Sequence, residues 1–203
     1  MTPTIRPLGA ADLSEAVALQ RECFPAPFPE ELLWQPEHLE RHLAVFPEGQ
    51  FAAIMNGRVV ATASSTRIRT ERWQAHEDWD ATVGGPFLLS FAPDGEVLYG
   101  LDISVHPRFR GQGLARALYE ARFDLVRSLG MDRYATACRI PDYHLHSSAL
   151  SPEAYVELVA KGGLIDRTLT PLLRLGLKLV GVCREHMEDW ESRNSAALLE
   201  WTP

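Results

Sequence analysis

The sequence lacks the features that send a protein to a membrane or into a secretory pathway. None of its apolar runs approaches the roughly 18 residues that a membrane-spanning helix needs. The N-terminal stretch, MTPTIRPLGAADLSEAV, lacks the basic segment followed by an apolar segment that marks a secretory signal. We therefore expect a cytoplasmic protein with no membrane partner.

Cysteine and positive charge are also scarce. The cysteines, Cys23, Cys138 and Cys183, are far apart and form no CxxC pair, so neither a metal site nor a disulfide framework is expected. The 20 Lys and Arg residues are outnumbered by 27 Asp and Glu residues, which gives a net charge of −7. Because phosphate backbones are bound by basic surfaces, nucleic acid is not an expected partner. A small cationic or neutral ligand is compatible with this charge.

The order of the periodic segments indicates one domain of mixed class. A length of 203 residues with 46% hydrophobic content suits a single domain over residues 1–203. Two strand-like runs flank Asn56-Gly57, which predicts a β-hairpin. Residues 70–93 show no steady period and are expected to be an insertion with surface structure. Together with late strands over 133–140, 177–183 and 195–201, the pattern predicts an α/β (α+β) fold with a mostly antiparallel sheet.

The most informative stretch is LDISVHPRFRGQGLARALYEARFDL, residues 101–125. An apolar strand ends at His106-Pro107, and a helical pattern follows two closely spaced glycines, Gly111 and Gly113. The first N–H groups of a helix have no acceptor within the helix, and glycine lets a phosphate approach the backbone closely. The stretch therefore predicts a phosphate-binding turn. Its spacing fits neither GxxxxGK[ST] nor GxGxxG, and the alternative is a solvated helix start with chance glycines.

The segment SVHPRFRGQGLARAL resembles the acyl-CoA pyrophosphate loop of the GNAT-type N-acetyltransferases, V-x-P-x-x-R-G-x-G-[IL]-[GA]-x-x-L. The later segment LRLGLKLVGV resembles the family's passage from a late helix into a strand. The segment CRIPDYH and the insertion before the long strand resemble a larger bacterial subgroup, some members of which are joined to a carbon–nitrogen hydrolase domain. The resemblance implies a GNAT-like sheet flanked by helices, with splayed central strands. It also implies an acyltransferase, and it allows a homodimer because late strands of this fold often pack between subunits.

The resemblance also implies a co-substrate site for acetyl-CoA. The pyrophosphate would bind the backbone N–H groups of the loop, and the pantetheine arm would pair with the strand edge as an added strand. A backbone N–H near Val105 would polarise the thioester carbonyl while a small-molecule amine or a peptide amine attacks it in a ternary complex. The residues assigned to this site are Ile103, Ser104, Val105, Arg110, Gly111, Gln112, Gly113, Leu114, Ala115 and Arg116.

Asp102 is the first candidate for the group that accepts the proton of the amine. A carboxylate inside an otherwise apolar strand is costly unless it is used or paired, and the alternative is a half-exposed or salt-bridged aspartate. Strict alternation along the strand would place Asp102 and Ser104 on the face opposite Leu101, Ile103 and Val105.

A general acid for the leaving thiolate is harder to assign. The family's usual tyrosine lies four residues before a glycine of the late helix, and that position here is Leu172, or Leu158 with the other alignment. Tyr143 is the candidate substitute, and Tyr155 is the alternative. The missing tyrosine also motivates a second hypothesis, a non-catalytic CoA-binding or CoA-sensing module.

Cysteine and tryptophan are two further residue types that could contribute to the site. Cys138 lies in a strand beside the expected gap, but no activating base can be named for it, so a covalent acyl-cysteine route is not expected. Trp73 and Trp79 in the insertion either line an aromatic acceptor pocket or pack in the core.

Overall fold

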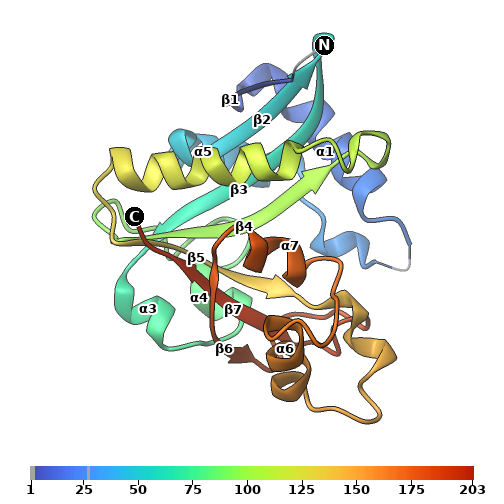
Figure 1. Cartoon of the computed structure of the whole chain (residues 1–203). Helices are drawn as coiled ribbons and strands as arrows, with labels where there is room; N and C mark the ends of the chain where they lie inside the picture. Colours follow the sequence, from blue (N-terminus) through green and yellow to red (C-terminus); the bar gives the residue numbers. More distant parts are fainter. Residues whose placement is uncertain (1–2, 27) are drawn as a thin grey trace.

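The computed structural model describes residues 3–26 and 28–203. Its centre is a seven-stranded sheet in the order β1-β2-β3-β4-β5-β7-β6 (Figure 1). Among the described strands, β4 and β5 run parallel, and every other neighbouring pair is antiparallel. The predicted mixed, mostly antiparallel sheet is therefore confirmed. The strands are β1 Thr4–Pro7, β2 Gln50–Met55, β3 Arg58–Ile68, β4 Val97–Val105, β5 Arg133–Arg139, β6 Lys178–Cys183 and β7 Ala196–Trp201.

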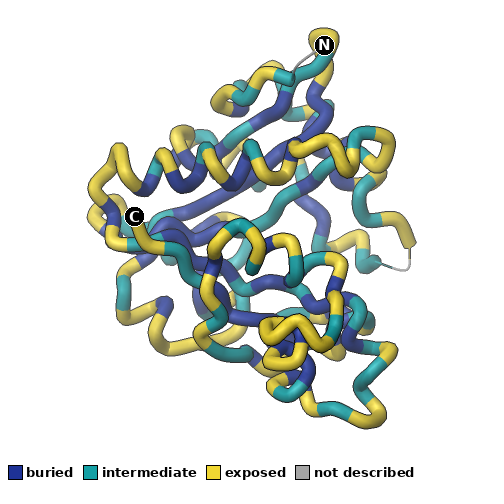
Figure 2. The backbone as a smooth tube through the Cα atoms, viewed as in Figure 1, coloured by how far each residue is buried: buried dark blue, intermediate teal, exposed yellow. Residues whose placement is uncertain are grey.

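Helices cover both faces of the sheet. Alternation along β2 points Ala53 toward Leu114 and Leu118 of α5, and it points Ala52 toward Val17 of α1. Figure 2 shows the strands beneath α5 as mostly buried and the outer side of that helix as exposed. No helix in the described part of the chain is both long and apolar enough to cross a membrane. The helices are α1 Leu13–Cys23, α2 Pro36–Val45, α3 Thr70–Gln74, α4 Trp79–Val83, α5 Leu114–Ser128, α6 Pro152–Ala160 and α7 Leu169–Arg174.

The hairpin between β2 and β3 forms as predicted. Asn56 and Gly57 both have positive φ, 52° and 75°, which is the backbone that a two-residue turn with the twist of the strands requires. The segment 70–93 forms α3, α4 and turns. Its side chains Trp73, Val83 and Leu88 are buried, so this segment contributes core packing as well as surface.

The parallel strands β4 and β5 separate along their length, as the resemblance implied. They pair at Val97, Leu98 and Tyr99, and the residues of β4 beyond Tyr99 have no partner on β5. At the point of divergence, the Oγ1 atom of Thr136 donates a hydrogen bond to the carbonyl oxygen of Gly100 at 3.0 Å. Figure 1 shows the two arrows ending far apart. The splay leaves one edge of β4 open toward the interior.

A β-bulge at Leu101 corrects the expected facing of β4. Ser64 lies opposite Asp102 and Ser65 lies opposite Gly100, so Leu101 is an extra residue in the ladder. Leu101 consequently packs on the α1 side of the sheet, where the Asp102 side chain also lies, whereas Ile103 packs toward α5. Strict alternation was therefore wrong for Leu101 and correct for Ile103 and Val105.

Candidate active site

A cavity of about 1070 Å³ opens where β4 and β5 separate. One wall consists of β4 and the turn that leads into α5. The opposite wall comes from β5 and α7, and the α1 side is closed by α1, α4 and the loop before β7. Representative lining residues are Gln20, Trp34, Trp79, Asp102, Val105, Gly113, Tyr119, Arg122, Cys138, Leu172 and His186.

The turn before α5 presents a row of main-chain N–H groups. Gly111 and Gly113 have φ of 75° and 82°, a conformation that favours glycine, and a Cβ atom at either position would point into open space. Gly113 is the N-cap of α5. The N–H groups of residues 111–116 donate to no other group in the described part of the chain. This arrangement, with the positive end of a 15-residue helix behind it, is suited to an anion.

The open edge of β4 adds two more donors. His106 N–H bonds to Val60 O, which makes residues 60 and 106 a hydrogen-bonded pair and Ala61–Val105 a non-hydrogen-bonded pair. In an antiparallel ladder these pairs alternate, so the N–H groups of Ile103 and Val105 point away from β3 and toward the gap. An extended, amide-bearing ligand could add to this edge as a strand does.

The polar side chains of this region have contacts of their own. Arg110 donates from Nε to Val105 O at 3.1 Å and from Nη2 to Cys23 O at 3.3 Å, so it ties the turn to β4 and α1. The Arg116 side chain pairs with Glu120 along the helix, and Gln112 donates to Arg108 O. Ser104 is buried and donates to Asp102, so its side chain faces α1 rather than the cavity.

Asp102 lies at the inner end of the open edge. Its Oδ2 atom accepts from Ser104 Oγ at 3.2 Å and lies 3.4 Å from Gln20 Nε2. Its Oδ1 atom is buried and has no partner among residues 3–26 and 28–203. No Lys or Arg of this described part forms an ion pair with the carboxylate, and Asp102 is among the residues that line the cavity.

The structure does not bring Tyr143 to Asp102. Its hydroxyl donates to Leu150 O at 2.9 Å, its ring packs 5.3 Å from that of Tyr155, and it does not line the cavity. The alternative, Tyr155, donates to the buried carboxylate of Asp166 at 2.9 Å. Both tyrosines are core residues: Tyr155 belongs to α6, and Tyr143 packs against it.

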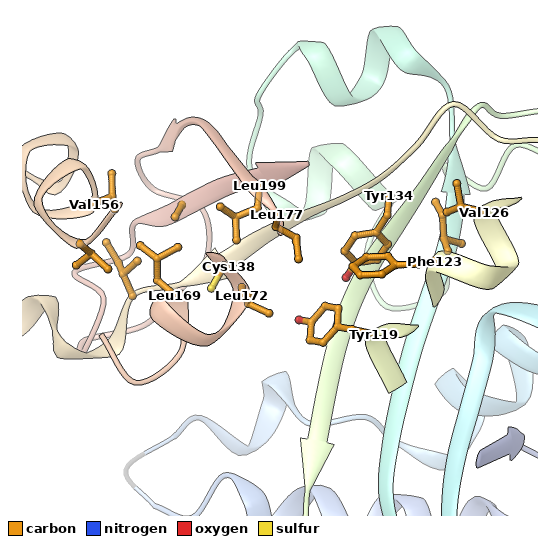
Figure 3. Packing of buried hydrophobic residues seen from close by; sticks show 14 of the residues in the cluster. Tyr119, Phe123, Val126, Tyr134, Cys138, Val156, Leu169, Leu172, Leu177 and Leu199 are labelled. Carbon is orange, nitrogen blue, oxygen red and sulfur yellow. The ribbon is translucent and has the colours of Figure 1, made fainter. Parts of the chain in front are cut away.

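Tyr119 of α5 is a cavity residue that sequence reasoning missed. Figure 3 shows its hydroxyl directed toward Leu172 of α7, the position counted for the family's usual tyrosine, and both residues line the cavity. Burial raises the pKa of Tyr119 well above its ordinary value, so the phenol stays protonated. Tyr119 shares helical spacing with Phe123 and Val126 of the core, and that spacing makes it resemble an ordinary packing residue in the sequence.

Arg122, one turn further along α5, is a second residue that the sequence did not single out. It is 1% exposed and has no carboxylate partner in the described structure. Its guanidinium donates to both carbonyls that flank the bulge, Ser64 O and Asp102 O, and to the hydroxyls of Ser65 and Tyr134. A buried cation thus holds the bulge that turns Asp102 toward the α1 side.

The remaining candidates from the sequence are Cys138 and the two tryptophans of the insertion. Cys138 lines the cavity, but burial raises the pKa of its thiol, which disfavours the thiolate that a nucleophile needs. The residues that the structure describes contain no group of three or more His, Cys, Asp or Glu side chains arranged to hold a metal ion. Trp79 lines the cavity, whereas Trp73 is buried and its indole donates to Glu200.

Two curated relatives match nearly the whole chain. The chain is 34% identical over 198 residues to "Uncharacterized N-acetyltransferase YkwB" of Bacillus subtilis, and the match covers 98% of this chain and 88% of that protein. It is 33% identical over 198 residues to "Probable hydrolase YhcX" of the same organism, covering 97% of this chain but 38% of that protein.

Solved structures share the fold at lower identity. The loading GNATL domain of CurA from Lyngbya majuscula has a TM-score of 0.83 at 22% identity, over 100% of this chain and 98% of that one. The GNAT-like decarboxylase GphF in complex with isobutyryl-CoA has a TM-score of 0.79 at 22% identity, over 98% of each chain. The family model "Acetyltransferase (GNAT) family" matches residues 13–147. The chain therefore belongs to the GNAT acetyltransferase family, a family of acyl-CoA-dependent acyltransferases.

Proposed function

We propose that this chain transfers an acyl group, acetyl in the first instance, from acyl-CoA to the amine of a small molecule or peptide. The observation that carries the proposal is the run of N–H groups at 111–116, which have no partner among the described residues and are continuous with the open edge of β4. The pyrophosphate binds the turn, and the amides of the pantetheine arm pair with Ile103 and Val105. GphF, with the same fold, is described in complex with isobutyryl-CoA, which supports a CoA-type co-substrate.

The transfer proceeds by direct attack of the amine on the thioester carbon. The C–N bond forms as the C–S bond breaks, and the N–H of Val105 stabilises the charge on the carbonyl oxygen. Asp102 Oδ1, which has no partner in the described chain, accepts the proton that the amine loses. Tyr119 replaces Tyr143 as the proposed proton donor to the CoA thiolate because it lines the cavity and Tyr143 does not.

Calorimetry with CoA and a thiol-release assay with acetyl-CoA and a panel of amines test the proposal. We expect CoA to bind and at least one amine to release thiol. Absence of CoA binding by the native chain would overturn the proposal. CoA binding without turnover of any amine would instead favour the CoA-sensing module, for which the leucine at position 172 is the motivating observation.

A further inference from the structure

The cavity has a second wall, away from the CoA turn, that has no part in binding the co-substrate. We call it the acceptor wall and define it by Glu31, Trp34, Trp79, Asp80 and Glu188, which all line the cavity. Glu31 and Trp34 precede α2, Trp79 and Asp80 lie in α4, and Glu188 lies in the loop before β7. Segments far apart in the sequence therefore build one surface.

Aromatic rings form the centre of the acceptor wall. The rings of Trp34 and Trp79 lie 5.9 Å apart at 43°, and His42 packs edge-on behind Trp34 at 4.9 Å. Trp34 is 7% exposed, and its Nε1 atom is buried with no acceptor among the described residues. A tryptophan pair that borders a cavity offers π faces to a ligand bound there.

The charge around these rings is negative. Glu31, Asp80 and Glu188 are exposed at the wall, and none of them forms an ion pair with any described Lys or Arg. Of the basic residues that line the cavity, Arg110 lies at the CoA turn and Arg122 lies beneath the bulge. The third, Arg139, is neutralised by a bidentate pair with Asp189 at 2.7 Å and by Glu191 at 3.1 Å. The acceptor wall therefore combines π faces with uncompensated carboxylates, the combination that attracts an organic cation.

The wall is linked to the proposed base. Gln20 Oε1 accepts the main-chain N–H of Trp34 at 2.6 Å, and Gln20 Nε2 lies 3.4 Å from Asp102 Oδ2. One amide side chain thus holds both the wall and the carboxylate. A ligand with two positive ends can meet the wall with one end and Asp102 with the other.

Building on the proposed function, we propose that the acceptor is an alkyl amine carrying a second positive charge, a diamine or polyamine, whose remote ammonium binds the acceptor wall. The reacting ammonium first gives one proton to Asp102 and becomes the free amine, whose nitrogen then attacks the acyl carbon. As the C–S bond breaks, Tyr119 gives a proton to the CoA thiolate, and the second proton lost by the nitrogen restores the phenol. A neutral remote end gains nothing from the wall, and an anionic remote end is repelled by it.

Three amines of equal chain length test this proposal: 1,4-diaminobutane, butylamine and 4-aminobutanoate. In the thiol-release assay at low salt, we expect kcat/KM for the diamine to exceed that for butylamine about tenfold, with 4-aminobutanoate below both. Asp80→Asn and Trp79→Leu should bring the ratio of diamine to butylamine close to one. Asp124→Asn, an exposed carboxylate on α5, is the matched control and should keep the ratio.

Binding supplies a readout that does not depend on turnover. Calorimetric titration of the three amines into the native protein saturated with CoA should give the same order of affinity. If CoA fails to bind, the proposed function is lost, while titration into the free protein still ranks the amines. If CoA binds and butylamine or 4-aminobutanoate matches the diamine, this inference alone is overturned. Trp79→Leu is accepted as a test only if its CoA affinity equals that of the native chain.

Discussion

Gln20 Nε2 lies 3.4 Å from Oδ2 of Asp102, although the two residues are 82 positions apart in the sequence. The glutamine is 4% exposed, and its other amide atom accepts the N–H of Trp34. The pair orients the carboxylate so that Oδ2 is occupied and Oδ1 is left without a partner in the described chain. One of the two side chains that contact the proposed base therefore comes from the first helix, which the motif at 101–125 does not include.

Asp102→Asn should lower kcat by roughly 10²–10⁴-fold, the usual contribution of a general base, and leave CoA affinity unchanged. The asparagine keeps the shape of the side chain and removes its capacity to accept a proton. Thiol-release kinetics and calorimetry with CoA measure the two effects. A variant that keeps native kcat would show that the amine loses its proton elsewhere.

Gly113→Asp should weaken CoA binding by at least about 100-fold, because a carboxylate repels the pyrophosphate and the positive φ is unfavourable for a side chain. Gly162→Asp is the control. Gly162 also has positive φ, 78°, with open space at its Cβ position, but it lies after α6. Both variants carry the same backbone strain, so calorimetry should show a loss of CoA affinity at position 113 only. Equal losses at both positions would point to misfolding rather than to a phosphate site.

Tyr119→Phe should lower kcat about 100-fold, whereas Tyr143→Phe should leave kcat near the native value. The first change removes a hydroxyl at the cavity, and the second removes a hydrogen bond to Leu150 O inside the core. Thermal denaturation identifies any stability loss of Tyr143→Phe. If kcat fell in Tyr143→Phe and not in Tyr119→Phe, Tyr143 would be the proton donor instead of Tyr119.

Arg122→Met should reduce the free energy of unfolding by about 3 kcal/mol, because it leaves two buried carbonyls and two hydroxyls without their donor. Arg116→Met, on the exposed side of the same helix, removes an ion pair with Glu120 and should cost no more than about 0.5 kcal/mol. Urea denaturation compares the two variants. Similar small losses would mean that the bulge is held without Arg122.

His186 should make the protein less stable as the pH falls from about 6.5 toward 4. Burial lowers the pKa of His186 to about 4 from an ordinary 6.5. In that interval the unfolded chain binds a proton that the folded chain does not, so the free energy of unfolding decreases by up to about 3 kcal/mol. Burial also lowers the pKa of His42, which acts in the same direction.

His186→Gln should therefore flatten the change in urea midpoint between pH 7 and pH 4.5, whereas His76→Gln, at an exposed position, should not. Carboxylates such as Glu153, whose pKa its Arg184 partner lowers from 4.5 to about 2, lose most of their stabilising effect below pH 4.5, the lower limit of this comparison. An unchanged midpoint difference in His186→Gln would assign the acid sensitivity to other groups.

Features that depend on a few neighbouring residues could be predicted from the sequence. The turn before α5 follows from two glycines and a helix N-terminus within six residues, and the hairpin follows from Asn56-Gly57. The separation of β4 and β5 came from the family resemblance, and the pairing register confirmed it.

Which side chains surround the cavity depends on contacts between elements that are distant in the sequence. The bulge at Leu101 depends on a guanidinium from α5, the unpaired oxygen of Asp102 depends on Gln20, and Tyr143 is drawn into the core by its bond to Leu150 O. These contacts join residues tens of positions apart, or depend on which side of a helix meets the sheet. Residue spacing along the chain does not predict these contacts, because they form when separate elements pack together.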